Sequence, residues 1–279
     1  MAGVRLVTDS SCDLPQETAE AHGIGIVPLT IRFGDEELVD REELSADEFY
    51  RRMAAFEGLP ETAAPSPGAF EQAFRAAGAD GDAVVCINLS AALSATMVAA
   101  QNAATALAGE LEVHVVDSRS ITAGLGTLVT MAAEAAEAGR SADDIVRLVE
   151  ETRPRSRVYG GLDTLENLKK GGRIGNAAAM LGALLSIKPV IDISTGEVEE
   201  AGKVRTRRKQ MLFLRDKLQE AGEVERLVVC DGGAPDAEEF VDLIAEIRPR
   251  DSFTRSTIGP VIGTHGGPRM IGMTWLAPA

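Results

Sequence analysis

Cysteine, histidine and aromatic residues are scarce in this 279-residue chain. Its three cysteines, Cys12, Cys86 and Cys230, are odd in number, far apart, and each lies next to or inside an apolar stretch. This pattern excludes a disulfide scaffold and predicts buried thiols in a reducing cytosol. The sequence also lacks H-E-x-x-H, C-x-x-C and acidic calcium-loop motifs, so we expect no metal site.

Long apolar runs are missing as well. Arg5 and Asp9 interrupt the first apolar run, which argues against a secretory signal. Nowhere do about 18 apolar residues follow one another, as a membrane-spanning helix requires. The 45% hydrophobic and 25% charged residues are nevertheless typical of a folded globular protein. We therefore expect a soluble cytoplasmic protein without stable membrane insertion.

Positive charge is in short supply and unevenly placed. The chain has 28 basic and 43 acidic residues, a net charge of −15, which argues against non-specific binding to nucleic acid or an anionic membrane. Half of the basic residues lie in residues 150–217, where the net charge is +5. Residues 1–149 carry −15 and residues 218–279 carry −5. This distribution leaves room for a local basic site that binds a phosphorylated or acidic group.

Short apolar segments alternate with helical patterns in the first half of the chain. Continuous apolar runs predict buried parallel strands, joined by right-handed crossovers through helices on both faces of the sheet. We expect strands at Val4–Thr8, Ile24–Phe33, Ala83–Leu89 and Val113–Val116, a hairpin arm at Glu37–Val39, helices at Ser45–Phe56, Pro67–Ala77, Leu93–Ala108, Leu125–Ala138 and Ser141–Thr152, and a loop at Gly58–Gly68. The fold class is therefore α/β, with an N-terminal three-layer α/β/α domain over residues 1–156.

After Pro154 the pattern changes to hairpins mixed with helices. We expect helices at Leu162–Lys170, Ala177–Ser186, Arg205–Ala221 and Ala237–Ile247, and strands at Lys188–Ile193, Glu197–Lys203, Leu227–Cys230, Ser252–Ile258, Val261–Thr264 and Met270–Trp275. This arrangement predicts a second α/β domain with a mixed sheet over residues 157–279.

Polar residues gather directly after the predicted strands of the first half. They are Asp9-Ser10-Ser11, Thr62, the segment from Ser90 to Thr96, and Asp117-Ser118. In open α/β sheets ligands bind at the carboxyl edge, so these segments predict a shared site lined with hydroxyl groups. The alternative is that each residue caps the helix that follows it.

The sequence contains incomplete motifs for two other kinds of site. A serine hydrolase of small esters would use Ser94, His265 and Asp117, but the G-x-S-x-G pattern is absent around Ser94. A dinucleotide-binding site would need G-x-G-x-x-G after the first strand, and the nearest match, Gly124-Leu125-Gly126, lacks the third glycine.

Two glycine-rich segments stand out in the second half. Gly171-Gly172-Arg173-Ile174-Gly175 combines backbone freedom with a planar donor suited to phosphate or carboxylate, and basic residues surround it in sequence. The alternative for that region is a solvated basic helix face. In the segment Gly259–Pro268, glycines and prolines lie on both sides of His265. This composition is compatible with a functional or a structural role of the histidine.

Taken together, these segments resemble the DegV family of bacterial fatty-acid-binding proteins. The matching motifs run in order along nearly the whole chain: Thr8-Asp9-Ser10, Asp13-Leu14-Pro15, Val27-Pro28-Leu29, Thr62, Pro65-Ser66-Pro67, Ser90, Leu93-Ser94-Ala95-Thr96, Val116-Asp117-Ser118, Leu165-Glu166, Gly171-Gly172-Arg173-Ile174, Ile187-Lys188-Pro189, Lys203-Val204-Arg205-Thr206, Ile258-Gly259-Pro260 and His265-Gly266-Gly267-Pro268.

The resemblance implies a two-domain α/β protein that holds a long-chain fatty acid in a buried tunnel between its domains. It implies that Thr62 and Ser94 bind the carboxyl group, with His265 in the surrounding network. Ser90, Ala95 and Thr96 belong to the same ligand-binding segments.

The resemblance also implies a lipid-carrying subunit that has no catalytic residues or cofactor of its own. Such a subunit presents the acyl group to a separate ATP-binding fatty acid kinase subunit, which makes acyl phosphate for phospholipid synthesis. Arg173 and Arg205 match the residues expected to contact the phosphate or that partner. The alternative interpretation of the same resemblance is a lipid sensor without a kinase partner.

The chain departs from the family pattern at three positions. Ala91 stands where a second serine is common, Ala95 where glycine is common, and Arg269 where small residues are common. We expect Ala95 to shift the carboxylate slightly and Arg269 to add a charge near the head group.

Overall fold

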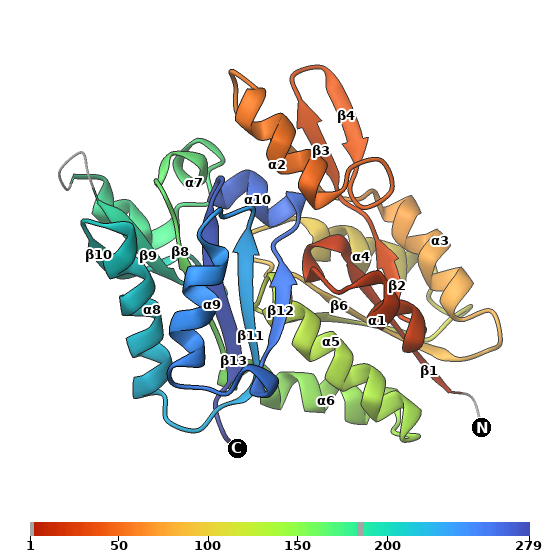
Figure 1. The fold of residues 1–279 in the computed structure, drawn as a ribbon. Helices are drawn as coiled ribbons and strands as arrows, with labels where there is room; N and C mark the ends of the chain where they lie inside the picture. The colour runs from red at the N-terminus through yellow and green to blue at the C-terminus, as the bar shows by residue number, and fades with distance from the viewer. Residues whose placement is uncertain (1–2, 183–186) are drawn as a thin grey trace.

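The computed structural model describes residues 3–182 and 187–279, and in it the chain forms three β-sheets with helices packed around them (Figure 1). The strands of the parallel sheet all precede residue 118, and those of a six-stranded sheet all follow residue 155. The three strands of a small third sheet fall within residues 30–63, inside the part of the chain that forms the parallel sheet. The α/β class predicted from the sequence is confirmed.

The four-stranded sheet has the order β2-β1-β6-β7, and all its neighbouring strands are parallel. Its strands are β1 (Val4–Asp9), β2 (Gly25–Val27), β6 (Ala83–Asn88) and β7 (Val113–Asp117). Successive side chains of β6 enter different cores because strand residues alternate between faces. Val85 and Ile87 pack with helices α5 (Thr122–Glu137) and α6 (Ala142–Thr152), whereas Val84 and Cys86 pack with α3 (Pro67–Ala77) and α4 (Thr96–Ala106). The predicted three layers are thus present.

Short helices and a small sheet extend this half. Helix α1 (Gln16–Ala21) links β1 to β2, and α2 (Ala46–Ala55) packs against the three-stranded sheet, whose order is β4-β3-β5. The strands of this sheet are β3 (Thr30–Phe33), β4 (Glu36–Val39) and β5 (Glu61–Ala63).

Two predictions for this region are wrong. The single strand expected at Ile24–Phe33 is two strands in different sheets, because Pro28 has no N–H with which to continue the ladder. The loop expected at Gly58–Gly68 contains β5, a three-residue edge strand between prolines whose Thr62 pairs with Ile31 of β3.

The six-stranded sheet has the order β10-β9-β8-β13-β11-β12. It is mixed, as expected, because β11 and β12 are parallel while the other neighbours are antiparallel. Its strands are β8 (Ser156–Gly161), β9 (Lys188–Asp192), β10 (Glu199–Val204), β11 (Glu225–Gly232), β12 (Thr254–Thr257) and β13 (Met270–Leu276). Helices α8 (Arg207–Glu220) and α9 (Ala237–Ala245) lie side by side on one face of it (Figure 1).

The second half contains four further corrections. Strand β8 was not predicted, and the helix expected at Leu162–Lys170 is only the short α7 (Glu166–Lys170). The strand expected at Val261–Thr264 is helix α10 (Pro260–Gly266), since Pro260 takes the first helical position, where its fixed φ favours a helix. Of the helix expected at Ala177–Ser186, residues 175–182 form a 3₁₀-helix, η3, and residues 183–186 lie outside the described part.

Helix α5 joins the two large sheets. It contacts β1 and β6 of the parallel sheet and β8, β11 and β13 of the six-stranded sheet. One hydrophobic core therefore extends across residue 157, from Leu6 and Ile87 to Ile191 and Met270. The division into domains at that residue remains a proposal.

The structure also shows the state of the cysteines and the lengths of the helices. Cys12, Cys86 and Cys230 are buried free thiols, as predicted. No helix within residues 3–182 and 187–279 has the length and apolar character needed to cross a membrane.

Candidate functional site

A narrow apolar cavity lies between the two large sheets. Its walls come from the six-stranded sheet, from the segment after β6, from the start of α5, and from both ends of α10. The apolar lining includes Leu93, Ile121, Val158, Ile191, Ile262 and Met270. The volume of the cavity is about 90 Å³. An almost wholly apolar wall with a few polar groups suits a ligand that is mostly hydrocarbon.

The few hydrogen-bonding side chains on this wall include Thr62, Ser94, Arg173 and His265. Thr62 Oγ1 lies 2.9 Å from His265 Nε2. Ser94 Oγ lies 2.9 Å from Thr96 Oγ1 and accepts the Thr96 N–H at 3.2 Å. These side chains come from four separate segments of the chain.

Local structure explains how each side chain reaches this place. Pairing of β5 with β3 holds Thr62 at the edge of the small sheet. Ser94 ends the loop after β6, and its bond to the Thr96 N–H satisfies one of the free amides at the start of α4. His265 lies in the last turn of α10, and Asn167 Nδ2 donates to the Thr264 carbonyl at 3.1 Å beside it.

His265 is neutral at pH 7. Burial, together with the positive charge of Arg173, lowers the pKa of its imidazole to about 4. Its Nδ1 atom is buried and has no hydrogen-bond partner among the described residues, and a Cβ atom at Gly171 would come within 2.6 Å of it. The Nε2 atom therefore carries the ring's one polar contact, to Thr62.

Arg173 lies at the border between the cavity and the protein surface. Its Nε donates to the Leu93 carbonyl at 3.2 Å and its Nη1 to the Gly171 carbonyl at 2.6 Å. Within residues 3–182 and 187–279 no carboxylate forms an ion pair with it. Its positive charge is therefore held in place by backbone carbonyls and is not neutralised by an acidic side chain.

A second, more open depression, here called the outer cleft, adjoins this polar end. It is lined by residues 57–62, Glu166, Asn167, Lys170, Gly171, Arg173, Thr264 and His265. Thr62, Arg173 and His265 line both the outer cleft and the cavity. A group bound at the polar end of the cavity is therefore close to the surface.

Several of the predicted site residues do not line the cavity. Ser90 is buried and donates to the Gly196 carbonyl at 2.6 Å, and Thr96 is buried behind Ser94. Ala95 is exposed at the start of α4. Arg205 is exposed, and it lines neither the cavity nor the outer cleft.

The other polar segments that follow strands have structural roles, as the capping alternative suggested. Asp9 is fully buried and accepts the Leu89 N–H at 2.8 Å and the Asn88 side-chain amide at 3.2 Å. Its burial raises the pKa of its carboxyl. Asp117 Oδ1 accepts the N–H groups of Ala91 and Arg119. These aspartates fix the loop that ends at Ser94 without lining the cavity.

Ser94, His265 and Asp117 do not form a catalytic triad in the described structure. Ser94 bonds to Thr96, His265 bonds to Thr62, and the Asp117 carboxylate accepts backbone amides. Because Nδ1 of His265 lacks a partner, no carboxylate orients the ring as a general base requires.

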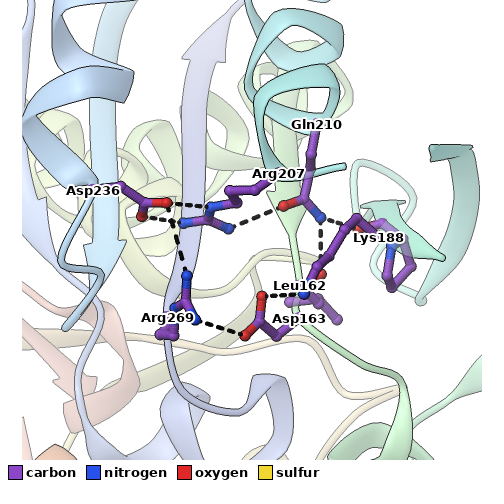
Figure 2. A network of polar contacts seen from close by, with 8 residues as sticks. Leu162, Asp163, Lys188, Arg207, Gln210, Asp236 and Arg269 are labelled. Carbon is purple, nitrogen blue, oxygen red and sulfur yellow. Dashed lines mark hydrogen bonds and ion pairs between the residues drawn. The ribbon is translucent and has the colours of Figure 1, made fainter. Parts of the chain in front are cut away.

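Arg269 belongs to a polar network and does not line the cavity or the outer cleft. It has an unusual positive φ of 61° and lies 3.7 Å from Asp163 and 4.0 Å from Asp236 (Figure 2). The same network contains Lys188 paired with Asp163, Arg207 paired with Asp236, and buried Gln210, whose Nε2 donates to the Leu162 and Pro189 carbonyls at 2.8 and 2.7 Å. Arg269 thus shares these two aspartates with Lys188 and Arg207, and its charge is not added to the cavity lining.

Most apolar residues of the cavity wall were not predicted as site residues. Val158 and Gly160 lie on the unpredicted strand β8, and Val261 and Ile262 lie on α10. Their apolar character is the same as that of core residues, so only the arrangement in space distinguishes a cavity wall from a core.

Comparisons with known proteins agree with this geometry. Residues 3–278 match the model of the family described as "Uncharacterised protein, DegV family". A DegV domain-containing protein of Listeria monocytogenes is 34% identical over 279 residues, covering 98% of each chain.

Solved structures share the whole fold. The structure of "Fatty Acid Binding of a DegV family Protein from Thermus thermophilus" superposes with a TM-score of 0.91 at 32% identity, covering 99% of this chain and 100% of the other. A stearic acid-binding protein of Eubacterium ventriosum has a TM-score of 0.89 at 27% identity, covering 99% and 98%.

Proposed function

This chain belongs to the DegV family, and from that membership we propose that it binds one long-chain fatty acid in its apolar cavity. The observation that carries the proposal is an apolar cavity whose wall includes the hydroxyl and imidazole groups of Thr62, Ser94 and His265. The fatty-acid-binding proteins among the solved structures of this fold support it.

The apolar wall supplies the binding energy. A chain of about sixteen carbons removes about fourteen methylenes from water, which contributes at most about 11 kcal/mol at about 0.8 kcal/mol each. Association and ordering costs offset a large part of this gain. The carboxylate adds a cost, because an unpaired buried charge loses its hydration.

Thr62 and Ser94 offset the cost of burying the carboxylate. We assign the proton of neutral His265 to Nε2, which then donates to Thr62 Oγ1 across the observed 2.9 Å. The Thr62 hydroxyl keeps its own proton free to donate to a carboxylate oxygen, and the Ser94 hydroxyl donates to the other oxygen. His265 thus orients the hydroxyl of Thr62 toward an anion.

The finer part of the proposal concerns what happens to the bound acid. Hydroxyl donors leave more negative charge on the carboxylate oxygens than an arginine would, so the carboxylate stays nucleophilic. We propose that a separate ATP-binding kinase subunit reaches it through the outer cleft. A carboxylate oxygen attacks the terminal phosphorus of ATP, ADP leaves, and acyl phosphate forms for phospholipid synthesis.

Arg173 is the charge that fits this step, because it lies at the border of the outer cleft and has no carboxylate partner among the described residues. The cleft as a whole carries charge of both signs, with Lys170 and Arg173 beside Glu57, Glu61 and Glu166. We assign Arg173 and, farther out, Arg205 to contact with the phosphate or the partner. The chain itself supplies no catalytic group in this scheme, and we propose that it acts as a carrier in the cytoplasm.

Native mass spectrometry of the purified protein, followed by lipid extraction, tests the binding proposal. We expect one fatty acid per chain, either co-purified or taken up on mixing with stearate. If no acyl chain co-purifies or exchanges, the protein is not a fatty-acid carrier. Addition of a kinase subunit and ATP then separates a kinase substrate carrier from a lipid sensor, because only the carrier yields acyl phosphate.

A further inference from the structure

One polar atom in the apolar part of the cavity has no hydrogen-bond partner. Thr274 lines the cavity from strand β13, and only 2% of its surface is exposed. Within the part of the chain that the structure describes, its Oγ1 neither donates nor accepts a hydrogen bond. The proposed carboxylate site does not use this hydroxyl.

Strand geometry places Thr274 away from the carboxylate site. Met270, Gly272 and Thr274 share one face of β13, whereas Ile271 and Met273 belong to the core under α8 and α9. The side chain of Met270 lies against Gly266, next to His265. Four residues at about 3.3 Å each put Thr274 about 13 Å farther along the strand than Met270.

The neighbours of Thr274 in the sheet supply no hydrogen-bond partner for its hydroxyl. It pairs across the sheet with Val158 of β8 and Val228 of β11. The next residue pair on the same face of the sheet is Gly272 with Gly160, so two positions beside the threonine carry no side chain. The nearby Thr122 hydroxyl is not available as a donor, because it donates to Asp13 Oδ2 at 2.6 Å.

A buried hydroxyl without a partner destabilises a protein, whereas valine has the same shape and no such cost. A threonine in this place has a physical reason only if something inside the cavity satisfies it. On the proposed function, the molecule that passes this point is the acyl chain. An oxygen substituent on that chain would complete the hydroxyl's hydrogen bonding.

We infer that Thr274 is a specificity-determining residue that binds an oxygen substituent, in particular a hydroxyl group, on the acyl chain. The inference rests on the proposed fatty-acid binding and names the ligand class more narrowly: long-chain hydroxy acids with the hydroxyl well away from the carboxyl group. The carboxyl anchor stays at Thr62 and Ser94. Thr274 then fixes the position along the chain at which an oxygen is accepted.

Competition binding tests this inference. Stearic acid and a series of hydroxystearic acids, with the hydroxyl moved along the chain, displace a fluorescent fatty acid from the wild-type protein and from the Thr274→Val variant. We expect one mid-chain isomer to bind best among the hydroxy acids. Relative to stearic acid, its affinity falls about tenfold in Thr274→Val, because its hydroxyl then lacks a partner. Stearic acid itself binds the variant as well as or better than the wild type.

Two matched variants serve as controls. Thr254→Val makes the same chemical change on exposed strand β12, outside the cavity wall, and leaves the preference unchanged. Thr274→Ser keeps the hydroxyl and retains the preference. If Thr274→Val fails to fold, Thr274→Ala removes the hydroxyl in its place and is expected to lose the preference.

The outcomes separate this inference from the proposed function. If stearic acid and the hydroxy acids all fail to bind, the proposed function is wrong. If they bind with the same ratios in wild type and Thr274→Val, or if no isomer stands out, fatty-acid binding holds and the role of Thr274 is overturned.

Discussion

Removing the Thr62 hydroxyl tests the carboxylate anchor most directly. In Thr62→Val, neither ring nitrogen of His265 has a hydrogen-bond partner among the described residues, since Nδ1 has none in the wild type and Nε2 has only Thr62. An unsatisfied buried group costs about 1–3 kcal/mol. At about 2 °C per kcal/mol for a protein of this size, Tm without ligand falls by about 2–6 °C.

The effect on ligand binding is larger and separately measurable. A hydrogen bond to a charged group contributes about 1.5–3 kcal/mol, which corresponds to about a 10- to 100-fold rise in the Kd for stearate. Stearate at about 100 times the wild-type Kd stabilises the wild-type protein by about 2.7 kcal/mol, or about 5 °C. After a hundredfold loss of affinity, the same concentration stabilises the variant by only about 0.4 kcal/mol, or about 1 °C.

A double-mutant cycle with Ser94→Ala sharpens the test. Ser94 is bonded to Thr96 and not to Thr62 or His265. We expect the two losses of stability without ligand to add within about 0.5 kcal/mol. The two losses of binding energy do not add, because both hydroxyls hold one carboxylate.

Differential scanning fluorimetry and isothermal titration with stearate and its methyl ester measure these quantities. The ester lacks the negative charge, so Thr62→Val weakens its binding less than that of stearate. Equal stearate-induced shifts in Tm for wild type and Thr62→Val, or equal effects on acid and ester, would refute the anchor.

Four further outcomes follow from the same structure. Arg173→Gln, which removes the charge without adding a negative one, and Arg205→Glu lower acyl-phosphate formation with a kinase subunit while stearate still binds; loss of lipid binding instead would show that these roles are misassigned. A fluorophosphonate leaves Ser94 unlabelled, because no hydrogen bond joins it to His265 or Asp117, and labelling detected by mass spectrometry would restore the hydrolase hypothesis. Gln210→Leu leaves the Leu162 and Pro189 carbonyls without this donor and lowers the free energy of unfolding by about 2–4 kcal/mol in urea titrations, whereas exposed Gln101→Leu changes it by less than about 0.5 kcal/mol. Burial raises the pKa of Asp13, which lies near Asp40 and Arg41, to about 7, so the folded state binds this proton more tightly than the unfolded state. The free energy of unfolding therefore falls as pH rises from about 4 to 7, by at most about 4 kcal/mol from this group, and Asp13→Asn removes that part of the slope; parallel profiles for wild type and variant would contradict this.

The sequence predicts strands β1, β6 and β7 of the parallel sheet well because each is a short and mostly apolar run. Ala83–Leu89 is apolar without interruption, which is typical of a strand covered on both faces. Ser45 and Ser141 cap α2 and α6 as predicted, since capping depends only on neighbours in the sequence.

The candidate site is less predictable because it depends on contacts across the fold. Ser94 follows a clear strand, but Thr62 lies on a three-residue strand that exists only through pairing with β3. His265 lies on a helix whose apolar residues are equally typical of a strand, and only Pro260 favours the helix. The family resemblance singled out these residues, whereas their polar character alone did not distinguish them from Asp9 and Asp117, which hold backbone amides.

The apolar cavity has a consequence for how much of the protein a cell maintains. Its walls belong to the same core that joins the two large sheets through α5. On the proposed function, a bound acyl chain completes that core and stabilises the folded state by mass action. Molecules without a chain unfold more often and are degraded sooner. The abundance of the protein would then follow the supply of fatty acid through protein turnover alone, without a dedicated regulator.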